Sequence, residues 1–250
     1  MPAACPVQSD GTGQEKESGM STIESLLTRG IEAFGAARYD EARGLYAEVL
    51  RRDPSHGIAN YHTGLIAGLA GDHDRAIEHI RRGIAGNVPE PKAHYNLGTL
   101  LHQRGRYNEA RQAYLRTLTL MPGYVNALSN LADVEYKFGN LGRAEEYARK
   151  AVSLAPAFFM AHNNLGNILK DQGRYTESAE SYRQAMQHRP DYAPANSNLL
   201  LSLGYDMRID PAIYFDEHKK YGERFSCEPV AGNAVDKSPD RRLRIGYVSP

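Results

Sequence analysis

Residues 91–124 read PKAHYNLGTLLHQRGRYNEARQAYLRTLTLMPGY, and the pattern of this stretch recurs along the chain. Its Asn-Leu pair at Asn96 has counterparts at Asn130, Asn164 and Asn198, each 34 positions after the one before. A fixed period of this kind is typical of helical hairpins that stack on one another, because one hairpin cannot bury its apolar face alone. The sequence therefore predicts an all-α fold.

Five units of 34 residues tile the chain without gaps. They cover residues 23–56, 57–90, 91–124, 125–158 and 159–192. The period and the residue types resemble the tetratricopeptide repeat, a helix–turn–helix unit. This resemblance implies a right-handed superhelical solenoid in which first and second helices alternate.

Recurring residue types explain how each unit folds. Glycine supplies the permissive backbone of a tight turn between two helices, at Gly71, Gly105, Gly139 and Gly173. Proline cannot continue a helix and closes the units at Pro54, Pro122, Pro156 and Pro190. Small residues such as Gly98 and Ala110 let the paired helices approach closely. Aromatic residues at 46, 114 and 182 are expected to fill the space between layers.

The segments outside the repeats have different compositions. Residues 1–22 are polar and predict a disordered leader. Residues 193–226 predict capping and connector helices, the first from Ala195 to Leu203 and the next starting at Asp210-Pro211. Residues 227–241 read as a linker. Residues 242–250 predict one terminal β-strand without a partner strand, as at the start of a further domain.

The composition argues against several classes of function. Basic and acidic residues number 30 each, so the chain lacks the basic excess of a nucleic-acid or membrane-surface binder. No apolar run approaches a membrane span, and the two cysteines suit a reducing cytoplasm. The acidic and histidine residues between Asp72 and His79 do not match a zinc spacing, and we expect no metal site. No residue pattern indicates an activated nucleophile.

Several segments resemble one family in particular. Asn-Leu-Gly at 96–98 and 164–166, and Asn-Leu-Leu at 198–200, resemble the repeats of O-linked N-acetylglucosamine transferases. His218, the run YGERF at 221–225 and the run RLRIGYVSP at 242–250 resemble the connector helix and first catalytic strand of bacterial members of that family. The match to the repeats is specific for the fold, and the match over 205–250 is more specific for the family.

The resemblance implies that a two-lobed glycosyltransferase domain follows the repeats in the parent protein. In the family this domain transfers N-acetylglucosamine from the UDP-sugar to a Ser or Thr hydroxyl of a protein, without a required metal. The residues that bind the sugar nucleotide lie beyond the first strand, where this sequence ends at Pro250. We therefore expect no catalysis and no cofactor in this chain alone, and UDP-GlcNAc is implied only as the donor of the parent enzyme.

The recurring asparagines are the best candidate for a binding site. A carboxamide has one carbonyl acceptor and an NH₂ donor, so it can pair with a peptide unit whatever the side chain of the ligand. We expect Asn96, Asn130, Asn164 and Asn198 to hold an extended peptide, as asparagines at this place do in the resembled family. Asp133 and Asn167 share their helical face and are further candidates. Asparagine is also common here in such repeats generally, where it serves only to solvate the surface.

Two functions fit these observations. The chain is either the substrate-recognition arm of a protein glycosyltransferase or a stand-alone adaptor that brings proteins together. Adaptors that grip a C-terminal carboxylate use basic residues on successive first helices. The place before the asparagines holds no lysine, since its residues are Leu27, Tyr61, Tyr95, Ser129 and Asn163. An extended internal segment is therefore the expected ligand, and pairing of two solenoids into a homodimer remains open.

Overall fold

The computed structural model describes residues 12–225, apart from residues 87, 89 and 90. Every regular element in this part of the chain is an α-helix. The helices are α1 (Thr12–Gly35), α2 (Tyr39–Arg52), α3 (Gly57–Leu69), α4 (His73–Ala85), α5 (Pro91–Gln103), α6 (Tyr107–Leu120), α7 (Val125–Lys137), α8 (Leu141–Leu154), α9 (Phe159–Asp171), α10 (Tyr175–His188), α11 (Ala193–Tyr205) and α12 (Pro211–Phe225). None of these helices has the length and apolar character needed to cross a membrane.

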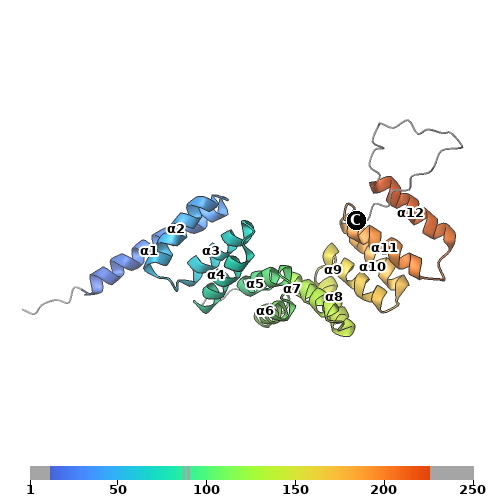
Figure 1. The fold of residues 1–250 in the computed structure, drawn as a ribbon, viewed down its shortest axis with the longest axis horizontal. Helices are drawn as coiled ribbons and strands as arrows, with labels where there is room; N and C mark the ends of the chain where they lie inside the picture. Colours follow the sequence, from blue (N-terminus) through green and yellow to red (C-terminus); the bar gives the residue numbers. More distant parts are fainter. Residues whose placement is uncertain (1–11, 87, 89–90, 226–250) are drawn as a thin grey trace, which may run out of the picture. The chain divides into compact units, whose positions relative to one another are not determined.

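Helices α1 to α10 form five hairpins, and α11 follows as a sixth first helix (Figure 1). In each hairpin the first helix packs against the second, and each second helix packs against the first helix of the next repeat. The first helices also contact one another, α5 with α7, α7 with α9 and α9 with α11, more extensively than successive second helices do. The first helices therefore form the inner row of the stack. The predicted all-α solenoid is confirmed.

The C-terminal helices differ from the repeats. Helix α11 packs against α10 and α9 and buries Ala195, Leu199 and Leu203, so it covers the apolar end of the fifth repeat. Helix α12 belongs to a separate unit that begins at Met207. The Asp210 carboxylate accepts a 2.8 Å hydrogen bond from the Ala212 amide, which is the capping role expected of an aspartate before a helix.

One boundary differs from the sequence-based prediction. The leader over residues 1–22 was predicted to be disordered, whereas α1 begins at Thr12, so residues 12–22 are helical. Residues 14–17 read QEKE, which are good helix formers, and they adjoin a helix that packing has already nucleated. The rest of the predicted leader, the linker over 227–241 and the strand over 242–250 lie outside the described residues.

Paired helices approach each other where a glycine faces a tyrosine. A Cβ added to Gly98 would lie 2.6 Å from Cε1 of Tyr114, and one added to Gly166 would lie 2.5 Å from Cε1 of Tyr182. Tyr46, Tyr114 and Tyr182 are fully buried, as expected for residues between layers. The fourth repeat has Ala132 and Ala148 at the equivalent places, both fully buried. In this repeat, alanine replaces the tyrosine of the second helix and alanine also replaces the glycine of the first helix. The loss of volume on one helix is thus accompanied by a gain on the other, as close packing requires.

The turns within the repeats require a left-handed backbone. Gly71, Gly105, Gly139 and Gly173 have φ between 71° and 81°, and a Cβ added to any of them would meet no atom within 4 Å. Ala37 takes the same place in the first repeat with φ of 57°, and among the described residues it is the one non-glycine with a positive φ. This conformation costs about 1–2 kcal/mol for a residue with a Cβ.

We expect Ala37→Gly to stabilise the solenoid and Gly105→Ala to destabilise it. A Cβ at Gly105 would meet no atom within 4 Å, and Ala37 is exposed. Both effects therefore come from the backbone, and each should be about 0.5–1 kcal/mol in the free energy of unfolding. Urea unfolding followed by far-UV circular dichroism measures both. Shifts of the unfolding midpoint in the same direction for the two variants would contradict the assignment of strain to Ala37.

We expect Gly166→Ala to destabilise the fifth repeat by about 1–3 kcal/mol, because the added methyl would overlap the ring of Tyr182 in a packed core. Gly142→Ala is the matched control. Gly142 is also helical, yet a Cβ there meets nothing within 4 Å, so this variant should gain about 0.5–1 kcal/mol. Thermal unfolding compares the two variants. Equal stability would show that the glycine–tyrosine contact does not set the helix spacing.

Candidate functional site

The four recurring asparagines lie at the same place on successive first helices. Asn96 is on α5, Asn130 on α7, Asn164 on α9 and Asn198 on α11. Each is half-buried, so each side chain is shared between the protein interior and the surface. Because the first helices form the inner row of the stack, the four carboxamides follow one another along its inner face.

Each carboxamide is anchored to the preceding first helix through its NH₂ group. Asn96 Nδ2 donates to the Tyr61 hydroxyl at 2.9 Å. Asn164 Nδ2 lies 3.1 Å from both the backbone carbonyl oxygen and the hydroxyl of Ser129. A carbonyl oxygen only accepts hydrogen bonds, so the contact with Ser129 fixes which end of the Asn164 side chain faces the protein.

The same anchoring recurs at the other two asparagines with different partners. Asn130 Nδ2 lies 3.5 Å from the Tyr95 hydroxyl and 3.3 Å from the Tyr114 hydroxyl. Burial raises the pKa of Tyr114 to about 12. Asn198 Nδ2 donates at 3.1 Å to Oδ1 of Asn167. A carboxamide therefore joins every pair of neighbouring first helices from α3 to α11.

The carbonyl oxygens of these four side chains are not used in hydrogen bonds among the described residues. Within the part of the chain that the structure describes, no group donates a hydrogen bond to Oδ1 of Asn96, Asn130, Asn164 or Asn198. An acceptor held in place by its own NH₂ group is oriented before any ligand arrives, which lowers the entropy lost on binding. The arrangement is a row of four oriented, uncharged acceptors.

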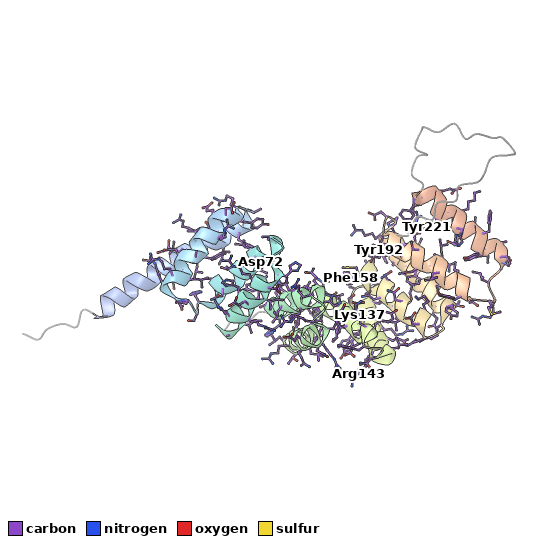
Figure 2. The ribbon with its side chains drawn as sticks, viewed as in Figure 1. Asp72, Lys137, Arg143, Phe158, Tyr192 and Tyr221 are labelled. Carbon is purple, nitrogen blue, oxygen red and sulfur yellow. The ribbon has the colours of Figure 1, made fainter. Side chains whose placement is uncertain are left out.

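The two additional candidates are engaged within the protein. Asp133 lies 2.8 Å from Nε2 of His102 and 3.8 Å from Nζ of Lys137, which Figure 2 labels at the end of α7. Oδ1 of Asn167 accepts hydrogen bonds from the Tyr182 hydroxyl at 2.8 Å and from Asn198. Both side chains therefore link neighbouring helices, and their contact with a ligand remains a prediction.

The row of asparagines begins at the third repeat, because the second repeat has a histidine at the equivalent place. His62 stands at the equivalent place on α3 and stacks on the ring of Tyr46 with centroids 5.3 Å apart. The hydroxyl of Tyr46 is buried without a partner among the described residues, whereas the equivalent hydroxyls of Tyr114 and Tyr182 reach carboxamides. Aromatic packing thus replaces the carboxamide contact at this end of the solenoid.

Sequence reasoning missed the residues that hold the carboxamides. Tyr61, Tyr95 and Ser129 each come just before the asparagine place of their own repeat, and each contacts the asparagine of the next repeat 35 positions on. Their hydrogen-bonding side chains were visible in the sequence. The period of 34 places them in one column but does not give the offset between stacked helices, so the pairing required the structure.

Comparisons with solved structures show the same architecture in other proteins. MamA protein is 22% identical, with a TM-score of 0.60 over 76% of this chain and 98% of its own. YrrB, described as a TPR protein with an unusual peptide-binding site, is 17% identical, with a TM-score of 0.65 over 74% of this chain and 96% of its own. These two likenesses concern the fold.

A third solved structure is more similar in sequence. The O-GlcNAc transferase of Thermobaculum terrenum is 34% identical over 64% of this chain, with a TM-score of 0.54. The match spans 31% of the transferase chain.

Models of the tetratricopeptide repeat match most of the solenoid. One model matches residues 27–89 and 129–193, which is more than half of the chain, and a second matches residues 90–157. These ranges contain the whole of each helix from α2 to α10, together with three of the four asparagines. The chain belongs to the tetratricopeptide-repeat family.

Proposed function

We propose that the inner face of the first helices binds an extended polypeptide through its main chain. The observation that carries this proposal is the row of four carboxamide oxygens, each oriented by its own NH₂ group and each without an internal donor among the described residues. Backbone N–H groups of an extended ligand recur at regular intervals and donate to such acceptors. As a tetratricopeptide-repeat protein the chain is a scaffold for protein–protein interaction, and the carboxamides give that role a chemical basis.

The chemistry of the row favours the main chain over particular side chains of the ligand. The four oxygens are identical and uncharged, so they do not distinguish between ligand sequences. The place before each asparagine carries tyrosine, serine or asparagine instead of lysine, so a terminal carboxylate would find no cation there. Capture of internal segments from many different proteins is the expected outcome.

We further propose that the chain is the substrate-recognition arm of a protein glycosyltransferase of the O-GlcNAc transferase type. Support comes from the 34% identity to the Thermobaculum terrenum enzyme, higher than the identity to MamA or YrrB, and from the resemblance over residues 205–250. A stand-alone cytoplasmic adaptor is the alternative, and similarity to MamA and YrrB is consistent with it. Pairing into a homodimer remains a prediction under both.

The two forms of the proposal differ in the native polypeptide. For a glycosyltransferase arm, we expect the native protein to extend beyond Pro250 and to transfer N-acetylglucosamine from UDP-GlcNAc to Ser or Thr of an acceptor protein. Intact mass spectrometry of the native protein and of an incubated acceptor measures both. A native polypeptide that ends at Pro250 and leaves the acceptor mass unchanged would favour the adaptor.

Replacing Asn130 and Asn164 together by alanine should weaken binding of several unrelated extended peptides to a similar degree. The loss of two acceptors, at about 0.5–1.5 kcal/mol each, predicts affinity lower by about tenfold. Fluorescence anisotropy with labelled peptides measures the dissociation constants, and circular dichroism checks that the helices remain.

The matched control for this variant is Tyr95→Phe combined with Ser129→Ala. These changes remove one hydroxyl partner from each of Asn130 and Asn164. They leave both carboxamides in place, and the contacts with the Tyr114 hydroxyl and the Ser129 backbone carbonyl remain. The control should lose stability with a much smaller loss of peptide affinity. Equal weakening by the two double variants would mean that the carboxamides only join the repeats. A loss confined to one peptide would indicate readout of side chains.

A further inference from the structure

The inner face contains an apolar pocket beside Asn96. The pocket has a volume of about 300 Å³ and is lined by residues of α1, α3, α4 and α5, among them Phe34, Leu65, Leu69 and Leu100. Asn96 lines the pocket, so the first carboxamide of the row lies at its edge. The lining also includes the uncharged polar residues Tyr95, Thr99 and Gln103, and none of the described lining residues is charged.

The pocket exists because the second repeat departs from the others at two places. Gly68 stands where the neighbouring repeats carry Phe34, His102, Tyr136 and Lys170, so a side chain is missing from the inner face of α3. Ile80 stands where three repeats carry the tyrosines at 46, 114 and 182, and both Gly68 and Ile80 line the pocket. Both residues are smaller than most of their counterparts, and both line the same space.

The loss of the tyrosine also changes the surroundings of the carboxamide. Asn130 contacts two tyrosine hydroxyls, Tyr95 and Tyr114, whereas the one hydrogen-bond partner of Asn96 among the described residues is Tyr61. The residue at the place of Tyr114 is Ile80, which has no hydroxyl. Asn96 and Ile80 line the same pocket. Leu69, which lines the same pocket, is 64% exposed.

We propose that this pocket takes one large uncharged apolar side chain, such as leucine, from the polypeptide whose main chain is held at Asn96. This inference rests on the proposed binding of an extended polypeptide and adds a residue preference to it. The N–H of the bound residue pairs with Oδ1 of Asn96 while its side chain enters the space above Gly68 and Ile80.

The size and polarity of the pocket limit what it accepts. A volume of about 300 Å³ is at the lower end for ligand sites, and it suits one amino-acid side chain better than a cofactor. A charged side chain would lose its hydration without gaining a partner, because the lining has no opposite charge. Burial of apolar surface favours leucine over alanine, and we expect an affinity gain of about tenfold for a partly enclosed site.

Filling the pocket tests the assignment. A Cβ added to Gly68 would lie 3.6 Å from Cδ2 of Leu100 and 3.7 Å from Cβ of Ala76, which is ordinary contact, so Gly68→Leu should fold and occupy the pocket. Gly68→His is a second variant, since the third repeat carries His102 at this place. Gly44→Leu is the matched control, because Gly44 is helical and exposed on α2 with nothing within 4 Å of an added Cβ.

The probes are labelled peptides of alternating serine and alanine with a central leucine, alanine or aspartate, bound to the full chain in anisotropy titrations. We expect the leucine peptide to bind about tenfold more tightly than the other two to wild type and to Gly44→Leu. Gly68→Leu and Gly68→His should abolish this preference while the alanine peptide binds as before.

Each other outcome has a defined meaning. If all peptides bind equally and binding still depends on Asn130 and Asn164, the pocket inference is wrong and the proposed function stands. If no peptide binds to wild type, the proposed function fails and the inference fails with it. A dimer that Gly68→Leu dissociates, without any preference among the peptides, would assign the pocket to a second copy of the chain and overturn the proposal.

Discussion

In three of the five repeats, the contact between a glycine on the first helix and a tyrosine on the second sets the spacing of the hairpin. A single methyl group at Gly98 or Gly166 would enter the tyrosine ring at 2.5 to 2.6 Å, so the two axes cannot carry larger residues there without moving apart. Since each repeat packs only on its neighbours, a change of spacing in one hairpin displaces the surface that the next one needs. The regular placement of the asparagines follows from this regular packing.

Each of the four asparagine carboxamides both joins two helices of the solenoid and exposes an acceptor at its surface. The NH₂ group of each joins two first helices, while the carbonyl oxygen remains available. A ligand that binds several of these oxygens therefore contacts groups whose position depends on the stacking of the repeats. Binding and cohesion of the stack are coupled for this reason, because any ligand that binds only the folded state stabilises it.

Local features of the fold could be predicted from the sequence, and features that depend on stacking could not. The turn glycine at Gly105 and the helix start at Asp210-Pro211 depend on a few neighbouring residues, and the structure places both as predicted. The partners of Asp133 depend on how α5 lies against α7, so its contact with His102 was not visible in the sequence. The helical start at Thr12 was missed because composition alone does not show that a helix downstream will extend.

The candidate site combines residues that follow the repeat with residues that depart from it. The asparagines were found because they repeat, whereas the pocket beside Asn96 arises where the repeat fails, at Gly68 and Ile80. Comparison of each place across the repeats could have revealed that failure, since glycine stands among phenylalanine, histidine, tyrosine and lysine. In the proposed binding mode, a row of identical acceptors gives affinity that is independent of ligand sequence, and it cannot by itself set the register of a bound chain. The proposed pocket in one irregular repeat would supply that register, because one apolar side chain fixed at one place determines which residues meet every other acceptor.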